Sequence, residues 1–185
     1  MPLRAFALLR AADVTFAYAR ARTGSAADVL HGVSLEVPAG GFAGILGPNG
    51  SGKTTLLRLL AGTERAAAGS VTLDGRELGT MSRTMLARRM AVVPQETRLA
   101  FDYSVLEVAM MGRYPHLGAF EIEGPSDFAI AREALSETGT LVLQNRLFTT
   151  LSGGEKQRVV IAAALAQIGS SKDALLLLDE PTAAL

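Results

Sequence analysis

One glycine-rich segment, residues 47–54, constrains this chain more than any other feature. It reads Gly-Pro-Asn-Gly-Ser-Gly-Lys-Thr and matches the pattern G-x-x-x-x-G-K-[S/T] at every fixed position. The short apolar run at 42–46 is typical of a buried strand, and the leucine-rich stretch 54–61 has a helical pattern. Glycines let the backbone curl so that several N–H groups point inward, beside the positive end of the following helix. The segment therefore predicts a site for nucleotide phosphates.

The side chains of this loop extend the prediction to particular contacts. Lys53 supplies a mobile cation for the β- and γ-phosphates, and Thr54 offers a hydroxyl to Mg²⁺. The alternative interpretation is a plain glycine turn between a strand and a helix. The candidate phosphate-binding residues are Gly47, Pro48, Asn49, Gly50, Ser51, Gly52, Lys53, Thr54 and Thr55.

A second candidate site lies near the end of the chain. Residues 174–178 are wholly apolar and predict a short buried strand, which Asp179 and Glu180 follow. In proteins with such a phosphate loop, an Asp at this place holds Mg²⁺, and an adjacent Glu can orient or deprotonate the attacking water. The alternative is a strand that ends in a solvated acidic turn.

The rest of the chain interleaves strands with helices, which favours an α/β fold with a mostly parallel sheet. Ser104 with Glu107, and Ser152 with Glu155, form capping boxes that predict two helix starts. Ser126 is expected to cap a further helix that ends at Glu137. The other expected elements are strands at 33–37, 71–73 and 91–93, a tight turn at Asp74-Gly75, a helix at 82–90, helical structure over 104–144 and a buried helix from Ser152 to about Gln167.

Composition excludes several classes of protein. Eighteen basic residues balance eighteen acidic ones, so no basic surplus suggests nucleic acid as a partner. The absence of cysteine excludes disulfides and Cys-ligated metals. No apolar run approaches the roughly 18 residues that cross a bilayer, and the N-terminal stretch is too short for a secretory signal. We expect a cytoplasmic protein whose membrane association comes through a partner.

A downstream motif makes the phosphate-loop interpretation specific. Residues 151–155, Leu-Ser-Gly-Gly-Glu, followed by Gln157 and Arg158, resemble the signature motif of ABC ATPases. A capped helix start alone would not explain why the motif lies just ahead of the acidic strand. The resemblance implies a P-loop NTPase fold, with a RecA-like core, an antiparallel N-terminal β region and an inserted α-helical subdomain. It also implies three parts: 1–96 (β region and phosphate-loop half), 97–150 (helical subdomain) and 151–185 (signature helix and acidic strand).

The resemblance carries roles to matching residues. Tyr18 is similar to the aromatic residue that stacks on adenine, with Phe16 as a weaker candidate. Gln95 is similar to the glutamine that reaches Mg²⁺ and senses the transmembrane partner. Asp179 matches the metal-binding Asp and Glu180 the catalytic Glu. The cofactors implied are ATP and Mg²⁺. A second subunit in a head-to-tail dimer would hold the γ-phosphate that meets the signature residues Ser152, Gly153, Gly154 and Glu155.

A narrower likeness concerns residues 105–107 and 111–116, the latter reading Met-Gly-Arg-Tyr-Pro-His. They resemble ATPases of importers for iron–siderophore, haem and cobalamin. This implies transmembrane permease subunits as partners, a substrate-binding protein indirectly, and a place on the cytoplasmic face of the cell membrane. The alternative for residues 113–116 is a helix end broken by Pro115, with His116 solvated. His31 is expected in a surface loop.

The chain departs from the ABC pattern after Pro181. The family continues with a loop Asp, a helix, a strand and a switch histidine, which are absent here, so we expect a partial sequence with an unfilled position beside the strand at 42–46. Two alternatives remain. One is a soluble ABC ATPase without a transport role, which is disfavoured because the helical insertion lacks heptads. The other is a nucleotide-binding fragment without turnover.

Overall fold

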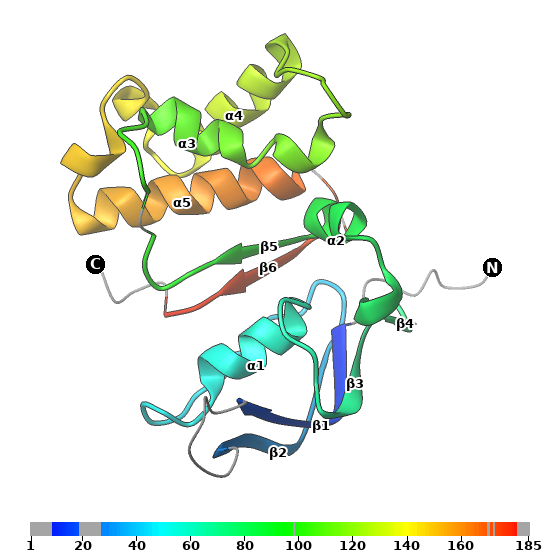
Figure 1. The fold of residues 1–185 in the computed structure, drawn as a ribbon. Coiled ribbons are helices and arrows are strands. Elements are labelled where there is room, and N and C mark those ends of the chain that lie inside the picture. Colours follow the sequence, from blue (N-terminus) through cyan, green and yellow to red (C-terminus); the bar gives the residue numbers. More distant parts are fainter. Residues whose placement is uncertain (1–8, 19–26, 98, 170, 172, 181–185) are drawn as a thin grey trace. The chain divides into compact units, whose positions relative to one another are not determined.

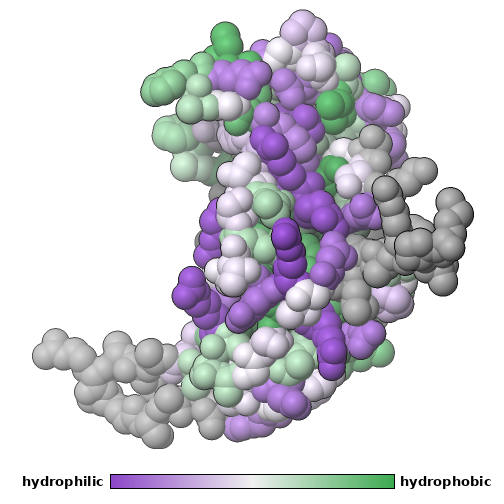
Figure 2. Space-filling view, turned by 90° about the vertical axis from the view of Figure 1, so that its right-hand side faces the viewer, coloured by the Kyte–Doolittle hydropathy of each residue, from purple (hydrophilic) through white to green (hydrophobic). Residues whose placement is uncertain are grey.

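The computed structural model describes residues 9–18, 27–97, 99–169, 171 and 173–180 (Figure 1). The chain divides into two compact units, Met1–Ser82 and Arg83–Leu185, and each is described by itself. No helix among the described residues is both long and apolar enough to cross a membrane. Figure 2 shows hydrophilic and hydrophobic residues interspersed over the viewed surface.

The first unit is built on an antiparallel sheet with strand order β2-β1-β3-β4. Its strands are β1 (Leu9–Tyr18), β2 (Ala27–Val37), β3 (Ala68–Leu73) and β4 (Arg76–Glu77), and one helix, α1 (Lys53–Leu60), contacts β1 and β2. The expected antiparallel N-terminal β region is confirmed, and α1 begins one residue before the expected helix.

The alternation of buried side chains in β1 shifts by one residue part-way along the strand. Leu9 and Ala11 are buried before the shift, and Val14 and Phe16 after it. A β-bulge absorbs the extra residue at Asp13, whose φ is 48° and whose N–H donates to Ser34 Oγ. The bulge keeps both halves of β1 facing the core, and Tyr18 follows Phe16 on the same side at the partly exposed end of the strand.

The hairpin between β3 and β4 has the predicted turn. Asp74 and Gly75 have φ values of 52° and 74°, so both central residues are left-handed, as a two-residue hairpin loop requires. Asp-Gly is among the few residue pairs that adopt this geometry readily.

The prediction of a strand at 42–46 is wrong. These residues form no β-ladder with any described strand, and the side chains of Phe42 and Leu46 are 96% and 95% exposed. An apolar run becomes a strand only where neighbouring strands take its N–H and C=O groups, and otherwise water must satisfy them. The unfilled position expected beside this strand therefore has no strand to flank.

The second unit carries a parallel pair of strands, β5 (Met90–Val93) and β6 (Leu175–Leu178), with Val93 opposite Leu178. Its helices are α2 (Arg83–Arg89), α3 (Val105–Met111), α4 (Pro125–Glu137) and α5 (Gly153–Ile168), with short 3₁₀ turns at Tyr114–His116, Leu141–Leu143 and Phe148–Thr150. The expected helical stretch 104–144 is therefore two α-helices and short turns rather than one continuous element.

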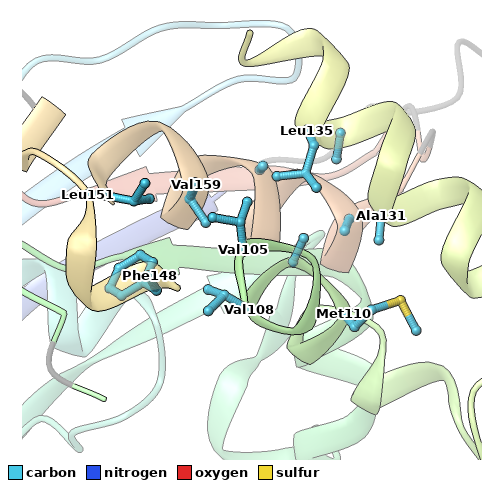
Figure 3. Packing of buried hydrophobic residues seen from close by; sticks show 12 residues of the cluster. Val105, Val108, Met110, Ala131, Leu135, Phe148, Leu151 and Val159 are labelled. Atoms are coloured by element: carbon cyan, nitrogen blue, oxygen red, sulfur yellow. The ribbon is translucent and has the colours of Figure 1, made fainter. Parts of the chain in front are cut away.

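Helix α5 lies between two hydrophobic clusters. One face packs with α3 and α4, where the side chains of Val105, Leu135 and Val159 gather (Figure 3). The opposite face places Ala164 against Ala91 and Val93 of β5. Because both faces are covered, the predicted all-round apolar character of this helix is explained.

The start of α4 differs from the prediction. Gly124, not Ser126, is the N-cap, and Pro125 occupies the first helical position. The carboxylate of Asp127 reaches back and accepts the Gly124 N–H at 3.0 Å. Pro with its fixed φ is well suited to a first helical position, so the Gly-Pro-Ser-Asp sequence places the N-cap two residues before the serine.

Candidate functional site

The phosphate loop keeps its curled backbone through left-handed glycines. Gly50 and Gly52 have φ values of 80° and 93°, and the Ser51 N–H donates to Pro48 O at 3.2 Å. Gly52 is the N-cap of α1 and brings no side chain to bond the first N–H groups of the helix. The helix N-terminus therefore presents backbone donors and its positive end, the arrangement that binds phosphate.

Lys53 closes over this loop. Its Nζ donates to Gly47 O and Pro48 O, both at 3.0 Å. A Cβ on Gly52 would lie 2.8 Å from Leu30 Cδ2 and 3.2 Å from Val29 O, and the φ of 93° at Gly52 disfavours any side chain. The ammonium group is thus held at the loop's own carbonyls, from which it can turn to phosphate oxygens.

Tyr18 contacts the helix that follows the loop. Its hydroxyl lies 3.2 Å from Thr55 Oγ1 and accepts from Arg58 Nη1 at 3.3 Å. Its ring meets the Phe16 ring edge-on, with centroids 4.8 Å apart. Tyr18 is 37% exposed, whereas Phe16 is 7% exposed. Of the two aromatic candidates, only Tyr18 has surface available to a base.

In the second unit, the ends of β5 and β6 bring three candidate residues together. The Asp179 N–H continues the ladder by donating to Val93 O at 2.9 Å, and its side chain is buried. Glu180, with φ 47°, is exposed, and its Oε2 accepts from Gln95 Nε2 at 2.6 Å. The two neighbouring acids therefore have different surroundings, with Asp179 buried at the strand end and Glu180 joined to Gln95 at the surface.

The donor chemistry fits a hard cation. Mg²⁺ prefers oxygen ligands and keeps several waters, so it needs few protein ligands. In the second unit, Asp179 offers a carboxylate, and Gln95 offers its amide oxygen because its nitrogen is turned to Glu180. In the first unit, Thr54 offers a hydroxyl. Across the described part of the chain, no three His, Cys, Asp or Glu side chains cluster as a metal site.

The signature segment forms the predicted capping box. Glu155 N–H donates to Ser152 Oγ at 3.3 Å, and Glu155 Oε2 accepts from the Ser152 N–H and hydroxyl at 2.8 Å each. The Ser152 backbone N–H, and then its hydroxyl, hold the pKa of Glu155 below its usual value. Ser152 and Gly153 are exposed, so the start of α5 is open to a partner.

Residues 111–116 have a structural explanation that the sequence did not supply. Arg113 is buried, donates from Nε to Asp127 Oδ1 at 3.0 Å and from Nη1 to Ala166 O at 2.7 Å. His116 is half-buried, with Nε2 2.7 Å from Gln167 O, so the alternative of a solvated His116 is wrong. Both side chains bind carbonyls in the last turn of α5, where the helix dipole favours cations.

Gly112 and Gln157 both lie in motifs identified from the sequence, but their packing was not predicted. Gly112 lies so close to α5 that a Cβ would be 2.1 Å from Ala163 O. Gln157 is buried, and its Nε2 has no hydrogen-bond partner among the residues that the structure describes. The polar residue within an apolar helix was the available signal for Gln157. His31 is exposed as expected, but it lies within β2 rather than in a loop.

Comparison with known proteins gives a consistent result. The sequence model of the family described as ABC transporter matches residues 30–183. The hemin import ATP-binding proteins HmuV of Methylobacillus flagellatus and Gloeobacter violaceus are 43% and 47% identical over 160 residues, covering 85% of this chain and 58% of each relative. The cobalamin import ATP-binding protein BtuD of Halobacterium salinarum is 41% identical over 157 residues, covering 85% of this chain and 38% of that protein.

Solved structures share the fold. A metal-chelate type ABC transporter in an inward-facing conformation has a TM-score of 0.77 and 32% identity, covering 97% of this chain and 62% of that one. A dimeric bacterial ABC transporter cassette has a TM-score of 0.80 and 28% identity, covering 96% and 75%. These cassettes have the expected α/β P-loop architecture. The chain spans less than two thirds of the length of the HmuV relatives.

Proposed function

The chain belongs to the ABC transporter family, and we propose that it is the ATP-binding and ATP-hydrolysing subunit of an importer for a metal chelate. The observation that carries the proposal is the complete phosphate loop at the N-terminus of α1, with Lys53 folded over it at 3.0 Å from two loop carbonyls. The relatives named for hemin and cobalamin import support the class of cargo, which includes iron–siderophore, haem and cobalamin.

In this proposal the first unit binds ATP. The N–H groups of the loop and of the first turn of α1 hold the phosphates, Lys53 neutralises their charge, and the partly exposed Tyr18 ring stacks on adenine. Mg²⁺, when bound, neutralises the β- and γ-phosphates. Oxygen atoms suited to that ion are carried by Thr54 in the first unit and, separately, by Asp179 and Gln95 in the second unit.

Glu180 is the proposed general base. A carboxylate at the exposed end of β6 can accept a proton from the attacking water, and Gln95 holds its Oε2 through the bond of 2.6 Å. Gln95 thus positions the base as well as offering its own amide oxygen.

The proposed assembly contains further chains. A second ATPase subunit in a head-to-tail dimer would contact Ser152, Gly153, Gly154 and Glu155, and the exposed start of α5 supports this. Permease subunits would contact the helical block 97–150, near Gln95, and hold the chain at the cytoplasmic face of the cell membrane. A substrate-binding protein would act through the permease, and nucleic acid is not a proposed partner.

The test is calorimetric titration of the full chain with Mg-ATP, comparing Lys53→Ala with Arg76→Ala. Each charged hydrogen bond is worth about 1.5–3 kcal/mol, so Lys53→Ala should lose roughly 10- to 150-fold in affinity. Arg76 is an exposed cation of the β3–β4 hairpin, and its removal should have no effect. Equal ATP affinity in the two variants would contradict the assignment of the phosphate loop.

A further inference from the structure

The hydroxyl of Tyr18 joins two side chains of one helix face. Thr55 and Arg58 are three residues apart on α1, so they lie side by side on its surface. Thr55 Oγ1 is 3.2 Å from the Tyr18 oxygen, and Arg58 Nη1 is 3.3 Å from it. The residue proposed to contact the base is therefore tied directly to the helix that begins with Lys53.

The chemistry of the three side chains identifies the donor in the contact between Arg58 and Tyr18. A guanidinium can only donate, so the Tyr18 oxygen accepts from Arg58. Either hydroxyl can donate in the contact between Tyr18 and Thr55, and a bond from the Arg58 cation favours donation by Tyr18. Because the Arg58 guanidinium is charged, it also strengthens the hydrogen bond between Tyr18 and Thr55. Arg58 consequently orients the hydroxyl as well as binding it.

The ring is held at both ends. At one end, the Phe16 ring meets it at 87°, and at the other the hydroxyl is bound by Arg58 and Thr55. A phenyl ring in the same place would keep the contact with Phe16 but could rotate away from α1. Since stacking on a base requires a defined ring plane, the hydroxyl contacts matter for a ligand that carries a base, and not for phosphates alone.

We propose that Arg58 is a positioning residue that fixes the Tyr18 ring through its hydroxyl, and so raises affinity for nucleotides over phosphate chains without a base. The inference rests on the proposed function, because it takes Tyr18 as the base contact. It assigns a role to Arg58, whose side chain is exposed.

The test compares two ligands on the full chain, Mg-ATP and inorganic triphosphate with Mg²⁺, by calorimetry. Tyr18→Phe and Arg58→Ala should each lower the ratio of ATP to triphosphate affinity roughly two- to tenfold, the value of one hydrogen bond. Triphosphate affinity should stay unchanged. Arg58→Lys keeps a donor and should retain most of the ratio, and Arg65→Ala removes an exposed arginine elsewhere in the unit and should change nothing.

The double variant Tyr18→Phe/Arg58→Ala sharpens the test. Tyr18→Phe already removes the bond that Arg58→Ala removes, so the ratio of the double variant should be no lower than that of Tyr18→Phe alone. Additive losses, or an unchanged ratio in both single variants, would overturn the inference and leave the proposed function standing. An equal fall in the affinities for ATP and for triphosphate would also overturn the inference and leave the proposed function standing. Failure of the wild-type chain to bind either ligand would instead overturn the proposed function, and this inference with it.

Discussion

The side-chain amide of Gln95 donates to Oε2 of Glu180 at 2.6 Å, although 85 positions separate the two residues in sequence. The register of the parallel strands brings them together. Val93 pairs with Leu178, and each of the two polar residues follows two positions later. The carboxyl ends of parallel strands lie at one edge of a sheet, so this edge gathers the candidate base and its partner.

Glu180→Gln should bind Mg-ATP as tightly as the wild type but hydrolyse it about 10²- to 10⁴-fold more slowly, the usual contribution of a general base. The amide keeps the shape of the side chain and the contact with Gln95 while it removes the basic oxygen. Phosphate release measured under saturating ATP checks this, in an assembly that turns over. Glu137→Gln, at an exposed end of α4, is the matched control. Wild-type turnover in Glu180→Gln would remove Glu180 from the role of base.

Asp127→Asn should destabilise the second unit by about 3 kcal/mol, the lower end for a broken buried ion pair, because Arg113 keeps its charge among buried groups. The Gly124 N–H, and then Arg113, hold the pKa of Asp127 below its ordinary value of 3.8. A lowered pKa stabilises the folded state fully above pH 3.8, and this stabilisation is lost as the pH falls through the lower folded value.

Urea unfolding at neutral pH and below pH 3.8 checks this prediction. The difference between wild type and Asp127→Asn should shrink in acid, because the wild type loses the same contribution there. Asp102→Asn, at an exposed carboxylate, serves as control and should show a small difference at both pH values. A difference that does not depend on pH would mean that the Asp127 charge is not what stabilises the fold.

Gly112→Ala should destabilise the chain by about 1–3 kcal/mol through overpacking. The added Cβ would be 2.1 Å from the carbonyl oxygen of Ala163, and both are attached to backbone, so α3 and α5 would have to move apart. Gly79→Ala is the control, since a Cβ there meets nothing within 4 Å. Thermal unfolding of both variants tests this prediction. Equal unfolding midpoints for Gly112→Ala and Gly79→Ala would show that α3 and α5 separate at little cost in free energy.

Gln157→Leu should raise the free energy of unfolding by about 1 kcal/mol, because it removes a buried donor that has no partner in the described part of the chain and keeps a similar volume. Gln144→Leu should do the opposite, because Gln144 Oε1 accepts from Arg132 at 3.2 Å. Chemical denaturation of both variants gives the sign of each change in the free energy of unfolding. If Gln157→Leu is the less stable of the two, the Gln157 amide must be satisfied in the folded protein.

Several local features of this fold could be predicted because their causes lie within a few residues. The capping boxes at Ser104 and Ser152 and the turn at Asp74-Gly75 each depend on short-range bonds or on φ alone, and each forms as predicted. The same holds for the curled backbone of the phosphate loop. The cap expected at Ser126 is wrong because Gly124, Pro125 and Asp127 together offered a competing local solution.

Other features depend on residues that only the folded chain brings together. An apolar run at 42–46 is compatible with a strand, but a strand also needs neighbours to bond its backbone, and no sequence pattern states whether they are present. The last turn of α5 is bound by Arg113 and His116, which follow α3 far earlier in the chain. The sequence by itself therefore determined the residue types and local shapes of the phosphate loop, the signature start and the acidic strand. Tertiary structure alone decided that Gln95 bonds Glu180, that Arg58 bonds Tyr18 and that Gly112 admits no side chain, because each of these is a distance between segments set by strand register and helix packing.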